Sequence, residues 1–187
     1  DADAVRALLV DALADMGAVE AWDEVVRPVL GAVSQRWAHS GAGVEIEHLL
    51  SGCVSAVFGA RVGPEVARGR PPVLVAGMPG EQHVLPMVAL AAALAERGIG
   101  CRPLGADLPV PALASAVRRV APAAVVLWSQ MAETADVDVL ASLPRTRPRF
   151  RTYIGGPGWT GRELPPRVVV LESLGSACAE IGNVVSI

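Results

Sequence analysis

The sequence predicts an α/β fold in which a small helical bundle is followed by a parallel five-stranded sheet flanked by helices. Apolar residues recur at helical spacing through the first third of the chain, whereas from residue 72 onwards short, mostly apolar runs alternate with helical segments. Short apolar strands of this kind are typical of a parallel sheet covered on both faces. The predicted organisation is a bundle over residues 1–62, a linker over 63–71 and a sheet domain over 72–187.

The bundle is predicted from three amphipathic segments. Their apolar faces are Val5, Leu8, Leu9, Ala12 and Met16, then Val25, Val26, Val29, Leu30 and Val33, then Ile46, Leu49, Leu50, Val54, Val57 and Phe58. Gly17, the Ser40-Gly41 pair and Gly59 punctuate these segments. Short connections between amphipathic helices favour a small antiparallel bundle.

The second part of the chain predicts a Rossmann-like sheet. The predicted strands cover residues 73–77, 98–104, 123–128, 149–154 and 168–171. The predicted helices lie at about 84–97, 110–120 and 134–143, and from 173 onwards. Ligands of such sheets bind beyond the carboxyl ends of the strands, so the loops after Gly77, Trp128, Ile154 and Leu171 are the candidate binding site.

The composition argues against several classes of protein. The net charge of −3 is spread along the chain, without a basic stripe for nucleic acid. No apolar run reaches about 18 residues without a charge, Gly or Pro, and no signal peptide is visible, so no membrane association is predicted. Cys53, Cys101 and Cys178 lack C-x-x-C spacing, which disfavours disulfides or a zinc site and favours reduced thiols in a cytoplasmic protein.

The loop after the first predicted strand places a histidine at the binding edge of the sheet. His83 stands where the strand has ended and the next helix begins. A neutral imidazole there can donate a lone pair to a metal, and Glu81 could hold its other ring nitrogen and raise its basicity. The alternative is a histidine that only caps or hydrogen-bonds the start of the helix.

The next two loops carry weaker signals at the same edge. Ser129 offers a hydroxyl after the third strand, although a serine there is also a good helix N-cap. Gly155-Gly156 after the fourth strand would let a ligand approach the backbone, although an ordinary turn is the alternative.

Together the three loops resemble the cobalamin-binding fold, whose signature is D-x-H-x-x-G, then S-x-L, then G-G, each after a strand. This sequence reads Glu81-x-His83-x-x-Pro86, then Ser129-x-Met131, then Gly155-Gly156. The resemblance implies that His83 binds cobalt from below in place of the dimethylbenzimidazole tail. It further implies that Ser129 hydrogen-bonds the released tail and that the two glycines make room for it.

Three positions depart from that signature. Glu81 replaces Asp, which keeps the carboxylate but lengthens its reach. Met131 replaces Leu with little change of volume, and Pro86 replaces Gly.

The helical half extends the resemblance to the CarH/LitR photoreceptors, which are MerR-type transcriptional regulators with a C-terminal cobalamin module. Trp37 is followed after nine residues by Glu47-His48, with Val44 between them. A core tryptophan and a solvated Glu-His pair would be the ordinary interpretation of these residues. The resemblance instead implies that Trp37, Val44, Glu47 and His48 enclose the 5′-deoxyadenosyl group above the corrin, through apolar packing and polar contacts.

The resemblance also implies how the family signals. In it, a His directly after the Trp takes the upper cobalt position once light has broken the cobalt–carbon bond. Here Ala38 follows Trp37 and a histidine comes one place later, so His39 is a candidate for that role, about 100° further round the helix.

The expected function is therefore that of a non-enzymatic, adenosylcobalamin-binding light sensor. The resemblance implies a dark-state tetramer that holds DNA through an N-terminal winged helix absent from this sequence, and that light releases. A corrinoid carrier of a methyltransferase system is the alternative, because such carriers also place helices before a D-x-H-x-x-G domain. A Rossmann-like domain that binds another ligand, or none, is a third possibility.

Overall fold

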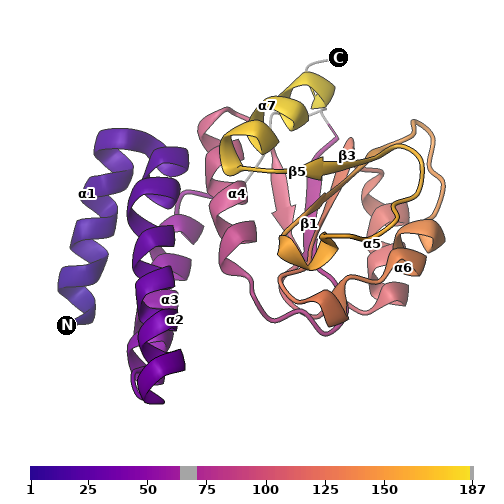
Figure 1. The fold of residues 1–187 in the computed structure, drawn as a ribbon. Coiled ribbons are helices and arrows are strands. Elements are labelled where there is room, and N and C mark those ends of the chain that lie inside the picture. Colours follow the sequence, from indigo (N-terminus) through magenta and orange to yellow (C-terminus); the bar gives the residue numbers. More distant parts are fainter. Residues whose placement is uncertain (64–70, 186–187) are drawn as a thin grey trace.

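The computed structural model describes residues 1–63 and 71–185, and Figure 1 shows two halves side by side. The helical half comprises α1 (Ala2–Glu20), a π-helical stretch η1 (Ala21–Val26), α2 (Arg27–Ser40) and α3 (Val44–Gly59). The predicted linker 63–71 falls almost wholly on residues 64–70, which lie outside the described residues.

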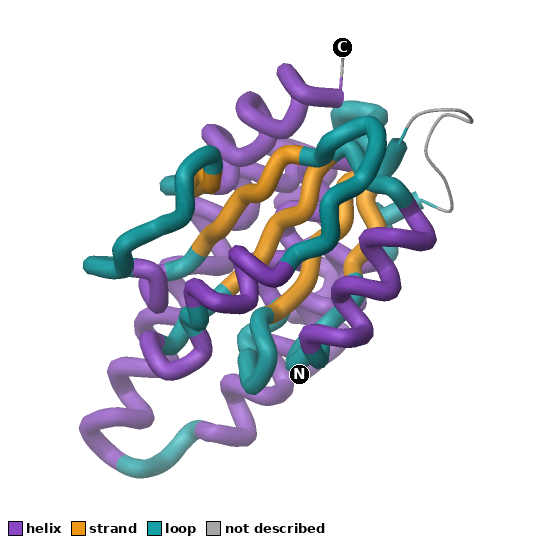
Figure 2. The backbone as a smooth tube through the Cα atoms, turned by 90° about the vertical axis from the view of Figure 1, so that its right-hand side faces the viewer, coloured by secondary structure: helices purple, strands orange, loops and turns teal. Residues whose placement is uncertain are grey.

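The α/β half contains the predicted five-stranded parallel sheet. Its strands are β1 (Val73–Gly77), β2 (Cys101–Pro103), β3 (Ala124–Trp128), β4 (Arg151–Gly155) and β5 (Val168–Leu171), in the order β2-β1-β3-β4-β5. Every pairing is parallel, and Figure 2 shows the strands between layers of helices. The strand order changes direction between β1 and β3, which is where open α/β sheets bind ligands.

Within residues 1–63 and 71–185, four helices cover the sheet. They are α4 (Leu85–Glu96), α5 (Val110–Val120), α6 (Val137–Ser142) and α7 (Leu174–Val185), with short 3-10 turns at η2 (Ala132–Thr134) and η3 (Pro157–Trp159). Residues of α5 and α6 share one apolar cluster with Leu74, Val125 and Ile154. Residues of α4, α7 and the bundle share the other cluster with Val73, Val75 and Val126. The alternation of strand side chains therefore gives the molecule two cores, one on each face of the sheet.

The helix α4 joins the two halves. It is apolar all round, and seven of its residues are buried: Met87 and Ala89–Leu94. On one side it packs on the sheet and α7, and on the other on α1 and α3. A helix of this kind is stable only when it is enclosed. The bundle and this face of the sheet thus share one of the two cores.

The glycine at residue 17 breaks α1, as its place in the sequence suggested. Gly17 has φ +82°, outside the helical region. The N–H of Ala18, which begins the next turn, donates to both carboxylate oxygens of Glu96 at 3.1 and 3.0 Å. A carboxylate from the end of α4 therefore caps the helix that leads into η1 and α2.

The predicted apolar faces of the bundle were wrong in part. Leu8 is 69% exposed and Met16 is exposed, whereas Leu9 and Leu13 are buried. Adjacent residues lie about 100° apart on a helix, so one partner surface cannot cover both Leu8 and Leu9. Leu49 is exposed beside the buried Leu50 for the same reason, and the predicted core residues Val29 and Ile46 are exposed as well.

The helix predicted at 134–143 was too long. The chain forms the turn η2 and then α6, whose N-cap Asp136 accepts from the N–H of Asp138 at 2.9 Å. The hydroxyl of Thr134 instead donates to the carboxylate of Glu81 in the loop. Among the residues that the structure describes, no helix combines the length and the apolar character that spanning a membrane requires.

Candidate functional site

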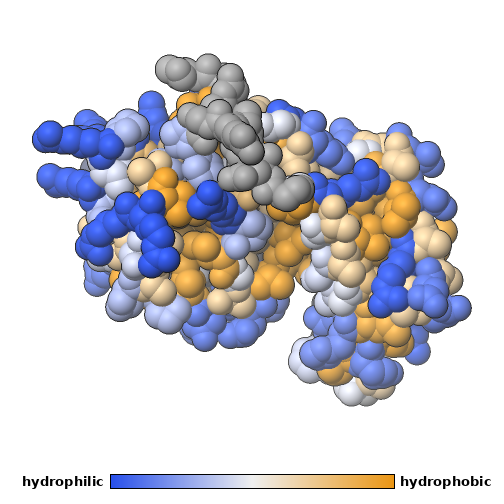
Figure 3. Space-filling model, turned by 180° about the vertical axis from the view of Figure 1, so that it is seen from behind, coloured by the Kyte–Doolittle hydropathy of each residue, from blue (hydrophilic) through white to orange (hydrophobic). Residues whose placement is uncertain are grey.

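A cleft of about 990 Å³ lies between the bundle and the carboxyl ends of the strands. Figure 3 shows the molecule from behind, notched between its two halves. The bundle contributes Trp22, Arg27, Leu30, Gly31, Ser34, Glu47, His48, Ser51 and Ser55 to the lining. The α/β half contributes residues 82–87, Leu90, Val126, Trp128, Gln130, residues 155–157, residues 170–174 and Ala177. The cleft is therefore at the change in strand order, the position that the sheet topology predicts.

His83 lies at the edge of this cleft with its side chain 53% exposed. Its Nδ1 lies 2.6 Å from Oε1 of Glu81, and its backbone N–H donates to the same oxygen at 2.8 Å. Pro86 lies in the first turn of α4, where a missing N–H leaves no helical hydrogen bond unmade. The Gly-to-Pro departure is thus compatible with this helix start.

Glu81 itself is buried, with 1% of its surface exposed. Its Oε2 accepts from the N–H of Gln130 at 2.6 Å, the N–H of Met131 at 3.3 Å and the hydroxyl of Thr134 at 2.9 Å. Burial alone would raise the pKa of this carboxyl. The hydrogen bonds from His83, Gln130 and Thr134 outweigh burial and lower the pKa to about 2.

The ionised Glu81 fixes the chemistry of the imidazole. A carboxylate can only accept, so the Nδ1 of His83 must carry a proton. In the neutral ring, Nε2 then has a free lone pair. A histidine oriented by a carboxylate in this way is the usual arrangement of a metal-ligating imidazole.

The remaining ligands of such a metal would have to come with the metal. Among residues 1–63 and 71–185, no group of three or more His, Cys, Asp and Glu side chains could hold a metal ion. A single oriented imidazole beside a large, mostly apolar cleft fits a metal that is already held in an organic macrocycle. The residues present therefore fit a cobalt corrinoid.

The other predicted residues of the sheet edge differ in their placement. Gly155 and Gly156 line the cleft. Ser129 is fully buried and does not line it; its hydroxyl donates to the carbonyl of Met131 at 2.8 Å and lies 2.6 Å from the hydroxyl of Thr134. The side chain of Met131 is 47% exposed, outside the lining.

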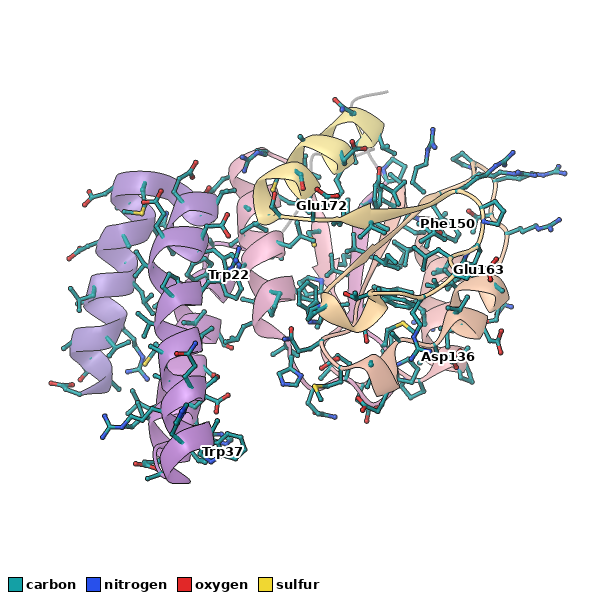
Figure 4. The ribbon with its side chains drawn as sticks, in the orientation of Figure 1. Trp22, Trp37, Asp136, Phe150, Glu163 and Glu172 are labelled. Carbon is teal, nitrogen blue, oxygen red and sulfur yellow. The ribbon has the colours of Figure 1, made fainter. Side chains whose placement is uncertain are left out.

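The predicted residues of the bundle are also divided. Glu47 and His48 line the cleft from α3, opposite His83. Val44 and Trp37 are exposed and do not line it; Figure 4 shows Trp37 at the far end of α2, away from Trp22.

His39 is also placed away from the cleft. Its Nδ1 lies 2.9 Å from the carbonyl oxygen of Gln35 at an exposed position of α2. The structure thus brings Glu47, His48 and His83 to one cleft and leaves Trp37, Val44 and His39 outside it.

Several residues of the site escaped the sequence interpretation. Thr134 completes the set of donors around Glu81, and Trp22 and Arg27 line the cleft from the bundle. Trp128 lines it from the end of β3. The position of Trp128 immediately before Ser129 was a usable signal, because neighbouring residues of a strand face opposite sides.

Three comparisons with known proteins bear on this site. Residues 1–61 match the family described as B12 binding domain. The chain is 31% identical over 164 residues to the HTH-type transcriptional repressor CarH of Myxococcus xanthus, covering 86% of this chain and 53% of that protein. This chain therefore spans about half the length of the curated relative that it matches.

The third comparison concerns the fold alone. The structure of the monomethylamine corrinoid protein of Methanosarcina barkeri is similar with a TM-score of 0.64 and 11% identity, covering 95% of this chain and 94% of that one. The order of a helical half before a parallel sheet thus occurs in a corrinoid protein of nearly the same extent.

Proposed function

Because this chain is a cobalamin-binding module of the CarH type, we propose that it holds adenosylcobalamin in the cleft between bundle and sheet and senses light for a transcriptional regulator. The observation that carries the proposal is the Glu81–His83 pair, which presents a free imidazole nitrogen at the edge of a large cleft. The bound cofactor supplies a cobalt–carbon bond that visible light can break.

The residues of the chain have separate tasks in this proposal. Glu81, held by Thr134 and the N–H of Gln130, keeps the Nδ1 proton on His83 and leaves Nε2 to bind cobalt in place of the lower base. Glu47 and His48, which line the cleft from α3, would contact the upper side of the ligand. Trp37 and Val44 would complete the enclosure of the adenosyl group, which requires the free ends of α2 and α3 to approach the ligand.

The response to light would be a change in assembly. Both halves line the cleft and would contact the adenosyl group, so the bundle would be able to move against the sheet once that group is lost. A ligand shifts such an equilibrium only through its different affinity for the two arrangements. We propose a tetramer in the dark that binds DNA through an N-terminal domain outside this chain, in the cytoplasm, with no enzymatic step.

A corrinoid carrier for methyl transfer is the second candidate. It is supported by the similarity in fold to the monomethylamine corrinoid protein. The two candidates differ in the upper ligand, because a methyl group is too small to use Glu47 and His48. Titration with adenosylcobalamin and methylcobalamin separates them: a clear preference for methylcobalamin would favour the carrier.

The experiment that tests the sensor uses absorption spectra and size-exclusion chromatography of the adenosylcobalamin complex, in the dark and after green light. We expect His83→Ala to weaken binding and to alter the visible spectrum, whereas the exposed control His39→Ala leaves both unchanged in the dark. An unchanged spectrum of His83→Ala would refute axial ligation. Identical elution of dark and photolysed samples would refute a signal transmitted through assembly of this module.

A further inference from the structure

We propose that Trp128, and not Ser129, contacts the nucleotide tail of the corrinoid, through the face of its indole ring and a hydrogen bond from its indole N–H. The inference rests on the proposed corrinoid function. It assigns the tail contact to a residue outside the S-x-L motif. Trp128 is the last residue of β3 and lines the cleft beside Gly155 and Gly156.

The direction of side chains along β3 separates the two candidates. Val126 and Trp128 face α4 and α7 and line the cleft. Val125 and Leu127 face the opposite core with α5 and α6. Ser129 continues the second series, and its hydroxyl is engaged by Met131 and Thr134 as described above. Its hydrogen-bonding capacity therefore supports the loop around Glu81.

The absence of side chains at Gly155 and Gly156 leaves space for the indole ring of Trp128. A Cβ at Gly155 would lie 3.1 Å from Cε3 and Cζ3 of Trp128, and one at Gly156 would lie 3.1 Å from its Cε2. The ring thus lies close against the backbone at the end of β4. Because no Cβ stands there, the indole can occupy this position and leave the cleft open beside it.

The indole N–H groups of Trp128 and Trp159 are both buried without a partner among the described residues, and of the two only Trp128 lines the cleft. Buried donors in native proteins are rarely left without an acceptor, and those that are call for an explanation. The ring borders the cleft while Nε1 itself is buried, so the proposed hydrogen bond requires the ring to turn towards an acceptor that packs against it.

The tail of a corrinoid matches this surface. When His83 replaces the lower base, that heteroaromatic base is released with a ring nitrogen that can accept a hydrogen bond. The α/β side of the cleft includes the polar residues Gln130, Glu172 and Ser173 and six apolar side chains: Met87, Leu90, Val126, Leu171, Leu174 and Ala177. A flat base packs well against an indole and aliphatic groups, and a single donor then fixes its orientation.

The test compares cobalamin with cobinamide, a corrinoid without the nucleotide tail. Both are titrated by absorbance into the wild type, Trp128→Phe and Ser129→Ala. Trp128→Phe keeps an aromatic face and removes the donor. The ratio of the two affinities in each variant is compared with the wild-type ratio, so the cost of releasing the base from cobalt cancels. Cobinamide binding also reports whether the variant is folded.

We expect Trp128→Phe to lose about tenfold in affinity for cobalamin, the usual effect of one lost hydrogen bond, and to bind cobinamide as the wild type does. Ser129→Ala should keep the wild-type ratio. In the wild type, one indole N–H resonance of the ¹⁵N-labelled protein should shift with cobalamin and stay in place with cobinamide, a measurement that needs no variant to fold.

Three outcomes would overturn the inference. A wild-type ratio in Trp128→Phe, with no tail-dependent indole shift, removes the contact while leaving the corrinoid function intact. A changed ratio only in Ser129→Ala returns the contact to the serine. A failure of the wild type to bind either corrinoid refutes the proposed function, and this inference with it.

Discussion

Oε1 of Glu81 lies 2.6 Å from Nδ1 of His83 and accepts the backbone N–H of the same residue at 2.8 Å. One oxygen atom therefore holds both the ring and the main chain of His83. The plane of the imidazole is set relative to its own loop before any ligand arrives, and such preorganisation reduces the cost of binding.

Replacing Glu81 should destabilise the protein in a pH-dependent way. In Glu81→Gln the side-chain NH2 would face the donors of Gln130 and Thr134 instead of accepting from them. The folded-state pKa of about 2 lies below the ordinary value of 4.5 for a glutamate, so the contribution of the ionised group is complete above about pH 4.5 and is lost as the pH falls towards 2. We expect Glu81→Gln to lower the free energy of unfolding at pH 7 by on the order of 3 kcal/mol.

Urea unfolding at pH 7 and pH 3 measures this effect, and Glu81→Asp serves as the charge-preserving control. The difference between the wild type and Glu81→Gln should shrink at pH 3. An equal difference at both pH values would mean that the ionised carboxylate is not what stabilises the loop.

The glycine at residue 156 should tolerate no side chain. It has φ +103°, and a Cβ there would overlap the carbonyl oxygen of Ser129, which accepts from the N–H of Gly158 at 3.0 Å. Gly161 is the matched control, because it has φ +75° but no atom within 4 Å of an added Cβ. We expect Gly161→Ala to cost about 1 kcal/mol of stability and Gly156→Ala several times more, measured by thermal or urea unfolding. Equal losses would show that backbone strain alone explains both.

Glu96 should couple the bundle to α4. Its carboxylate accepts the N–H of Ala18 beside the Gly17 break, at the start of a helix whose dipole favours negative charge. We expect Glu96→Ala to lower the free energy of unfolding by about 1 kcal/mol. Hydrogen exchange at Ala18 should become faster, while exchange in the sheet stays the same. Unchanged exchange at Ala18 would mean that Glu96 does not cap this helix in solution.

Two histidines, His48 and His39, allow a test of the upper part of the site. His48 lines the cleft, whereas His39 is exposed and lies beside the carbonyl of Gln35. His48→Ala should weaken adenosylcobalamin binding in the dark by about tenfold, the loss expected for one polar contact, and His39→Ala should leave it unchanged. A light-state spectrum that is the same in the wild type and His39→Ala would remove His39 as a cobalt ligand after illumination.

The sequence predicted the sheet better than it predicted the bundle. The helix Val110–Val120 and the strand Val168–Leu171 were predicted at their observed ends, because strand and helix periods differ and turn residues bound each run. Helix α1 carries apolar residues on two sides, and its buried side depends on where α3 and α4 lie, which no local pattern encodes. Leu8 was therefore predicted to be buried and is exposed.

Hydrogen bonds of the site could be predicted from the sequence where the two residues are close in sequence. They were missed where residues from distant loops meet. Glu81 and His83 are two residues apart, so their hydrogen bond could be expected. Thr134 reaches Glu81 across 53 positions of the sequence, and only the parallel register of β1 and β3 brings their loops together. Every cofactor contact predicted from the sequence, from that of His83 to that of Trp37, stays a prediction.

The enclosed helix α4 makes the two halves an obligate unit. It begins two residues after His83, and its small alanine side chains let α1 and α3 approach closely. A fragment beginning at residue 71 would expose that apolar flank to water and would be prone to aggregation. The sheet domain of one such protein could be exchanged for that of another. We expect the exchange to succeed only when the first two turns of α4 are transferred together with the bundle surface that packs on them.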